Sequence, residues 1–263
     1  MRTRRSLLLA GLVVLLRPAA VDAADPPPGP AYQIVLRSRH AEVTPNRTKG
    51  AETGGGSILV EQPEPNTIIV TMGGSAVVGS DCHGSSATMD FNLEQEFEII
   101  PTRPGVRPPR VGLVGRVVGT LQVSDPSKKG GKGCDTDAGK WCKPCGSAEQ
   151  GQASACLALG GTSLLTINVE PSAASCGQEL SINHRNGPVE TRAAVGDYHL
   201  SGSFRIGVNQ GKGVFNRQYA VADFDPAPQL AAFWSDALKP FRAVPRRDFG
   251  FKIVVRVVED AAP

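Results

Sequence analysis

Hydrophobic and polar residues alternate along three long stretches of this chain. Between Met89 and Ile99 the apolar side chains fall on odd-numbered positions, and the even-numbered positions carry Asp90, Asn92, Glu94, Glu96 and Glu98. The stretches Val111–Val123 and Tyr198–Val208 alternate in the same way. Because successive side chains of a strand point to opposite faces of a sheet, each stretch predicts a long strand with one buried and one solvated face.

Shorter apolar runs predict further strands. They lie at Gln33–Leu36, Ser57–Val60, Thr67–Met72, Leu164–Val169, Leu180–Asn183 and Phe251–Val258. The Pro-, Arg- and Gly-rich segment 101–110 separates the first two long strands, so we expect it to be a loop that joins them in a hairpin. The glycine clusters 53–57 and 73–75 are interpreted as turns, since neither leads into an expected helix.

One segment departs from the strand pattern. Asp225 and Pro226 are typical of a helix start, and the apolar residues that follow at helical spacing are Leu230, Phe233, Trp234 and Leu238. They predict one short helix that ends near Pro240 and covers a sheet with its apolar stripe.

The pattern as a whole predicts an all-β fold. About ten strands with frequent turn signals suit a single β-sandwich, with a jelly-roll and an immunoglobulin-like topology both open. The chain contains 30 glycines and 21 prolines, which also favours strands joined by turns. We expect the domain to span residues 32–260, to follow a proline-rich lead-in at 24–31, and to be interrupted by a loop insertion at 124–161.

The first 23 residues have the composition of an export signal. A basic start precedes an apolar run from Leu7 to Leu16, and small residues lead to a cleavage point after Ala23. The run is much shorter than the roughly 20 residues that cross a bilayer, so no permanent membrane anchor is expected. Residues 3–8, TRRSLL, resemble the twin-arginine export signal. That resemblance implies a bacterial protein that is exported already folded, to the periplasm or beyond the cell.

Charge and missing motifs exclude several classes of partner. Of the 28 basic and 25 acidic residues, the signal segment holds four and one, which leaves the mature chain formally neutral. No overall field attracts nucleic acid or an anionic membrane, so neither is an expected partner. The chain has no nucleotide-binding loop, zincin helix or nucleophile elbow. We expect a monomer without a cofactor.

Six cysteines predict disulfides in an exported protein. They are Cys82, Cys134, Cys142, Cys145, Cys156 and Cys176, and four of them fall in the segment 124–161. That segment is too polar to form a core, so cross-links are expected to constrain it. Pairing Cys82 with Cys176 leaves four cysteines and three possible connectivities.

The same segment has two alternative chemical interpretations. Residues 141–145, Trp-Cys-Lys-Pro-Cys, resemble the redox site of the thioredoxin family, which implies Cys142 as the attacking thiol and Cys145 as the resolving thiol. The strand and helix that flank this motif in the family are not predicted here. The spacing of the four cysteines between 134 and 156 also allows a zinc site, although we expect no bound metal.

Other polar clusters have simpler structural explanations. Residues 80–86 combine Asp81, Cys82 and His83 with several serines, and they are interpreted as a turn. The acidic pairs Asp135/Asp137 and Asp223/Asp225 are too few in ligands for a calcium site.

The leading functional hypothesis is an exported, non-catalytic module. It would bind a glycan or an envelope protein through loops at one end of the sandwich, with Trp141 as a stacking surface. The first alternative is an exported hydrolase on a jelly-roll scaffold, with carboxylates drawn from Asp90, Glu94, Glu96 and Glu98. The second is a metal- or thiol-handling protein that uses the Cys134–Cys156 segment. Acids buried in a groove would favour the hydrolase, and a flat solvated face would favour the binding module.

Overall fold

The computed structural model confirms the all-β prediction. It describes residues 29–48, 51–78, 85–123, 146–210, 219–224 and 250–260, and these residues contain no helix that could span a membrane. Thirteen strands cover most of them: β1 (Tyr32–Arg47), β2 (Ala51–Glu64), β3 (Thr67–Val78), β4 (Ser85–Pro101), β5 (Pro109–Val123), β6 (Ser147–Glu149), β7 (Ala153–Leu159), β8 (Thr162–Val169), β9 (Ala173–Ser175), β10 (Glu179–Arg192), β11 (Gly196–Gln210), β12 (Ala220–Asp223) and β13 (Gly250–Glu259).

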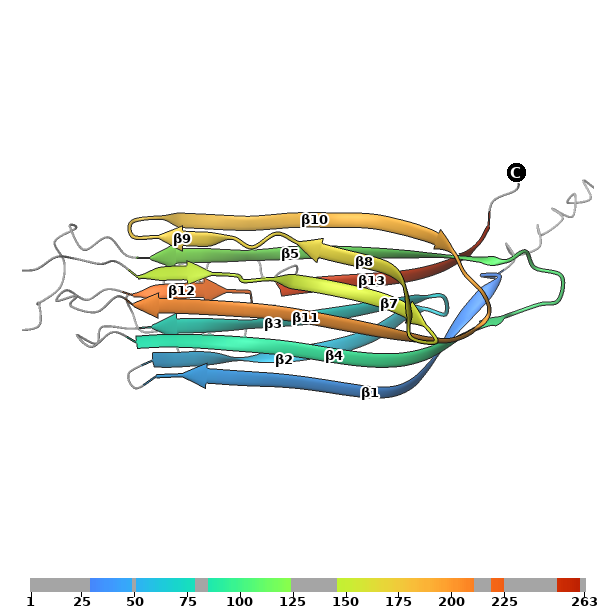
Figure 1. Ribbon diagram of the computed structural model, residues 1–263, viewed down its shortest axis with the longest axis horizontal. Coiled ribbons are helices and arrows are strands. Elements are labelled where there is room, and N and C mark those ends of the chain that lie inside the picture. The colour runs from blue at the N-terminus through green and yellow to red at the C-terminus, as the bar shows by residue number, and fades with distance from the viewer. Residues whose placement is uncertain are drawn as a thin grey trace, which may run out of the picture.

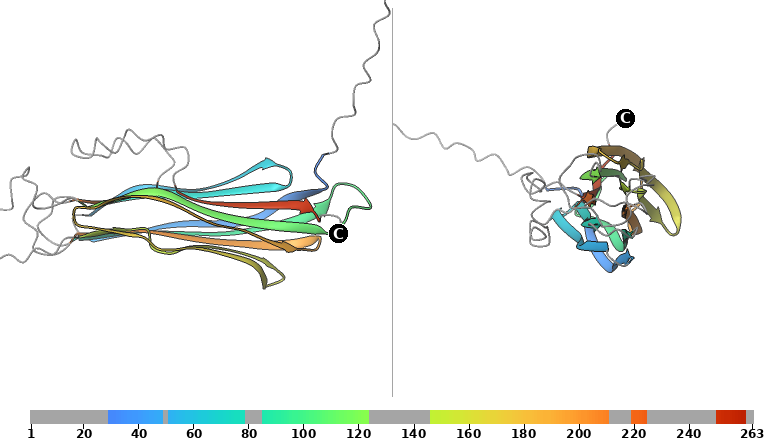
Figure 2. Two further views of the ribbon diagram at one scale, coloured as in Figure 1. Left: turned by 90° about the horizontal axis from the view of Figure 1, so that it is seen from above. Right: turned by 90° about the vertical axis from the view of Figure 1, so that its left-hand side faces the viewer.

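The strands form two antiparallel sheets that pack as a sandwich (Figure 1). In sheet A, β4 lies between β1 and β11, and the other side of β11 pairs with both β7 and β6. Beyond them, β8 pairs with β7 and β9 pairs with β6. In sheet B, β5 lies between β10 on one side and β12 and β13 on the other. β12 and β13 both pair with β3 on their far side, and β3 pairs with β2 at the edge. The strands run along the long axis of an elongated body (Figure 2).

The predicted alternation decides which side chains fill the core. On β4, Met89, Phe91 and Leu93 are at most 1% exposed, whereas Glu94 and Glu96 point to solvent. β11 places Phe204 opposite Phe91, with ring centroids 5.7 Å apart. The same Phe204 ring lies 5.8 Å from Phe251 of β13, so one aromatic cluster joins the two sheets.

Glycines inside the strands make room for these large side chains. Gly56 of β2 and Gly74 of β3 are register partners, and a Cβ on Gly56 would lie 2.6 Å from the Phe91 ring. The interpretation of these two glycine clusters as turns was therefore wrong. Gly56 and Gly74 form a recess in sheet B into which the Phe91 ring of sheet A packs, a use of glycine that local sequence does not distinguish from a turn.

The predicted hairpin of β4 and β5 was also wrong. β4 belongs to sheet A and β5 to sheet B. The loop 102–108 between them crosses from one sheet to the other, where Tyr32 Oη donates to the Arg107 carbonyl and Arg107 N donates to Glu259 Oε1. Alternation predicts which face of a strand is buried but carries no information about its lateral partner.

The second half of the predicted loop insertion is a regular part of the sandwich. β6 and β7 lie within 124–161, and Ala148, Ala153 and Leu157 are fully buried. Small residues on the inner face of these strands pack against the long side chains of sheet B, which is why the segment does not look like a core in sequence. Residues 124–145 and the predicted helix at 225–240 lie outside the described residues, as do the signal segment and most of the lead-in.

One end of the sandwich gathers chain segments that are far apart in sequence. In sheet B, Ala220 pairs with Val78 on one side and with Val123 on the other. In sheet A, Ser85 pairs with Gln210. Also at this end are Arg47, which pairs with Ala87, and Ser147, which pairs with Asn209 and Ser175. We call it the Gln210 end, and it is the end at the left of Figure 1.

Candidate functional site

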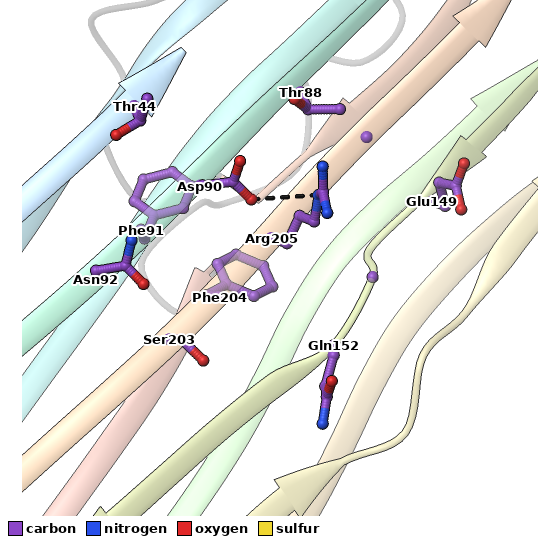
Figure 3. A pocket seen from close by; sticks show the side chains of 12 residues that line it. Thr44, Thr88, Asp90, Phe91, Asn92, Glu149, Gln152, Ser203, Phe204 and Arg205 are labelled. Carbon is purple, nitrogen blue, oxygen red and sulfur yellow. Dashed lines mark ion pairs between the residues drawn. The ribbon is translucent and has the colours of Figure 1, made fainter. Parts of the chain in front are cut away.

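The outer face of sheet A carries a polar groove near the Gln210 end (Figure 3). Its volume is about 680 Å³. Strands β1, β4, β11 and β6 and the link from β6 to β7 contribute its lining, which consists of Thr44, Thr88, Asp90, Phe91, Asn92, Glu149, Gly151, Gln152, Ser203, Phe204, Arg205 and Gly207. Because regular strands carry most of these residues, the backbone holds their spacing.

An ion pair crosses the centre of the groove. Asp90 and Arg205 are register partners on β4 and β11, and Arg205 Nε lies 3.2 Å from Asp90 Oδ1. The two side chains are 31% and 58% exposed, so both retain hydrogen-bonding capacity toward solvent. The alternation of β4 and β11 turns these polar residues outward and directs the rings of Phe91 and Phe204 into the core.

The remaining groups supply a mixed set of donors and acceptors. Glu149 is a second carboxylate, and Asn92 and Gln152 add planar amides. Ser203 Oγ lies 2.9 Å from Ser154 Oγ of β7, which fixes one wall. No aromatic ring is presented to solvent by the described lining residues, since Phe91 and Phe204 are at most 1% exposed. The groove therefore offers hydrogen bonds and charge rather than an apolar surface.

Glu94, Glu96 and Glu98 lie along the same face of β4 but outside the groove. Glu94 pairs with His199 of β11, Glu96 accepts a hydrogen bond from Ser38, and Glu98 pairs with Arg37. They lie on the outer face of sheet A, where Glu94 and Glu96 are exposed and Glu98 is half-buried. Of the four acids considered for a hydrolase, only Asp90 lines the groove.

Cys156 does not form the disulfide expected of it. It is a free thiol on the outer face of β7, and its Sγ lies 3.0 Å from Ser163 Oγ. Its register partner on β11 is Ser201. Asn209, eight residues farther along β11, pairs with Ser147, the first residue of β6. At about 3.4 Å per residue this is roughly 27 Å, which separates Cys156 from the Gln210 end.

Trp141, Cys82, Cys134, Cys142 and Cys145 lie outside the described residues. Within the described ranges, no group of three His, Cys, Asp or Glu side chains could hold a metal ion.

Sequence reasoning found Asp90 but missed the groove that surrounds it. Thr44, Arg205, Glu149 and Gln152 come from strands whose pairing the sequence does not reveal. The available signal was the alternation of polar and apolar residues along β4 and β11. It indicates which face of these strands is solvated but not which strands lie beside them.

Comparison with known proteins adds no functional information. No family model and no curated protein matches the chain. One similar solved structure is that of infectious bursal disease virus Gx strain, with 10% identity, a TM-score of 0.20, and coverage of 84% of this chain and 38% of that one. Another is the enzymatically active domain of bacteriophage CBA120 tailspike protein 4, with 9% identity, a TM-score of 0.14, and coverage of 73% and 19%. The chain spans well under half the length of either structure.

Proposed function

We propose that this protein is an exported, non-catalytic β-sandwich module that binds a glycan in the groove on the outer face of sheet A. The observation that supports this function is the groove itself, in which Asp90, Arg205, Asn92 and Gln152 project from a rigid sheet. Carboxylates accept hydrogen bonds, guanidinium groups donate them, and amides do both. Neighbouring sugar hydroxyls require this mixture, since each hydroxyl both donates and accepts.

The shape of the groove suits a chain of sugar units rather than a small buried ligand. It extends from β1 across β4 and β11 to β6. With strands about 4.8 Å apart, the span from β1 to β6 is roughly 14 Å, the length of a few sugar units. The open, solvated lining favours a ligand that keeps part of its hydration.

Export and disulfide formation remain part of the proposal. Cys176 follows β9 at the Gln210 end, where Gly177 N donates to the Val123 carbonyl at 3.0 Å. Val123 and Val78 flank Ala220 in sheet B, about 10 Å apart, and Cys82 follows Val78 by four residues. Four residues of extended chain reach about 13 Å, so this placement supports a Cys82–Cys176 disulfide.

Intact mass spectrometry of the protein recovered from its natural export route tests this part. We expect a start at Ala24 and a mass reduced by at least one disulfide. A retained signal segment, or six free thiols, would contradict export to an oxidising compartment.

A panel of immobilised neutral and acidic oligosaccharides tests the groove, with Asp90→Asn compared against Glu94→Gln. Both residues lie on the outer face of β4 and pair with a side chain of β11, but only Asp90 lines the groove. A hydrogen bond to a charged group contributes about 1.5–3 kcal/mol, so Asp90→Asn should weaken retention about tenfold or more. Glu94→Gln should leave it unchanged.

Equal effects of the two substitutions, or no retained oligosaccharide, would refute the proposed site. Release of shorter sugars from a retained oligosaccharide would instead support the hydrolase alternative, because a binding module leaves its ligand intact.

A further inference from the structure

β12 and β13 lie end to end between β5 and β3 in sheet B, as a single strand would, although 26 residues separate them in sequence. On the β5 side, Asp223 pairs with Thr120 and Gly250 pairs with Val118, which leaves the single position Gly119 for Phe224. On the β3 side, Asp223 pairs with Ser75, Phe224 N donates to the Gly74 carbonyl, and Phe251 pairs with Met72. Phe224 and Gly250 are thus successive in register with both neighbours, and residues 225–249 are an insertion into a single strand.

The insertion point lies inside the sheet, so the chain must leave it through one of its two faces. The inner face is filled, because Phe224 is fully buried and its ring centroid lies 5.4 Å from that of Phe204 in sheet A. A Cβ placed on Gly119 would meet the Phe224 ring at 2.2 Å, which shows that no free space adjoins it. The remaining exit is toward the outer face of sheet B.

Outward-pointing residues next to this exit are buried. Ser75, Val221 and Asp223 alternate with the core residues of β3 and β12, yet they are 0%, 1% and 3% exposed. Farther along the same outer face, Val258 is 41% exposed. Outer-face residues beside the insertion point are therefore covered, whereas Val258 is not.

The buried patch has a small apolar centre. Val221 packs against Val77 and Tyr219 in a cluster separate from the main core. Burial raises the pKa of the Tyr219 phenol, and the nearby carboxylate of Glu179 raises it further. Gln122 Oε1, beside Val221 in register, is buried with no hydrogen-bond partner among the described residues.

We propose that residues 225–249 dock on the outer face of sheet B over the cluster of Val77, Tyr219 and Val221. The segment has the required composition, because Leu230, Phe233, Trp234 and Leu238 recur at the spacing of one helical face. Both of its ends are fixed beside the patch, so docking costs little additional loop-closure entropy. The patch is thus an intramolecular interface, independent of the groove on sheet A.

Fluorescence of Trp234 in the full chain tests this interface. The chain has two tryptophans, so Trp141→Phe leaves Trp234 as the sole reporter. We expect its acrylamide quenching to be several-fold weaker than that of a free 225–249 peptide. Val221→Lys should raise quenching to the level of the peptide, and the matched substitution Val258→Lys on the outer face of β13 should not.

A second variant keeps the test decisive if Val221→Lys does not fold. Deleting residues 225–249, so that Phe224 is joined directly to Gly250, should give a folded protein, because the two residues are successive in register. It should expose the patch, bind the 225–249 peptide and lose that binding when the peptide is scrambled. Quenching of Trp234 equal to that of the free peptide in the Trp141→Phe chain, or no peptide binding by the folded deletion variant, would overturn the proposal.

Discussion

The contact between Gly202 of β11 and Ile253 of β13 gives a direct test of how the two sheets face each other. A Cβ added at Gly202 would lie 2.7 Å from Ile253 Cδ1 and 2.9 Å from Met72 Cε, both at the far ends of side chains of sheet B. Gly202→Ala therefore overpacks the core, which costs about 1–3 kcal/mol. Ile253→Val removes the closest methyl group and costs about 0.5–1.5 kcal/mol on its own.

The double variant should be more stable than the sum of the two single changes predicts. The new methyl group at position 202 enters the space that Cδ1 vacates, so the coupling should offset about 1–2 kcal/mol of the summed loss. For a domain of this size each kcal/mol shifts Tm by about 2–4 °C. Urea unfolding of the wild type, both single variants and the double variant measures the coupling.

A matched glycine control separates packing from backbone effects. Gly112 points outward from β5, and a Cβ there would make an ordinary 3.5 Å contact with Glu190 Cγ. Gly112→Ala should leave stability unchanged or raise it by up to about 1 kcal/mol, because alanine restricts the unfolded chain. Strict additivity of Gly202→Ala and Ile253→Val would refute the inferred packing of the two sheets.

Three further predictions concern polar groups. Asn66→Ala should cost about 1–3 kcal/mol in urea unfolding, because the buried Asn66 Nδ2 donates to the Val257 carbonyl at 2.8 Å and its loss leaves that acceptor unpaired; a loss within error would contradict this bond. Arg205→Ala should change stability by less than about 1 kcal/mol, since its ion pair with Asp90 is exposed, and a much larger loss would show a structural role. Burial raises the pKa of all three tyrosines above 10.0, so the folded state keeps phenol protons that the unfolded chain releases, and stability should fall as the pH rises past that value. Ultraviolet titration of the native protein checks this for Tyr32, Tyr198 and Tyr219, and tyrosinate formation centred at pH 10.0 would contradict it.

The sequence predicted the faces of the strands well because alternation is a local property. Met89, Phe91 and Leu93 turn inward, and Glu94 turns outward, as the pattern of β4 requires. The same pattern underestimated the lengths of β1 and β10, because most residues of β1 after Val35 and of β10 after Ile182 are exposed and polar positions there do not alternate regularly with buried apolar ones. Edge strands can be polar throughout, since only one of their sides is paired.

Lateral pairing and insertions could not be predicted from local pattern. The connection between β4 and β5, which the sequence predicts as a hairpin loop, is a crossing between sheets. β12 and β13 form one interrupted strand, although nothing in the local sequence indicates that they are successive in register. The recesses at Gly56 and Gly202 depend on rings and methyl groups from the opposite sheet. The candidate site was missed for the same reason, because its lining residues from β1, β6 and β11 come together only through the strand order of sheet A.

We propose that the groove around Asp90 and Arg205 is the ligand-binding surface. Its most direct test is titration of ¹⁵N-labelled protein with an oligosaccharide retained by the wild type, followed by amide chemical shifts. We expect shifts that cluster at Asp90, Arg205, Glu149 and Gln152, with little change at Glu98 and on the outer face of sheet B. Shifts confined to residues far from the groove would contradict it and place ligand binding elsewhere on the molecule.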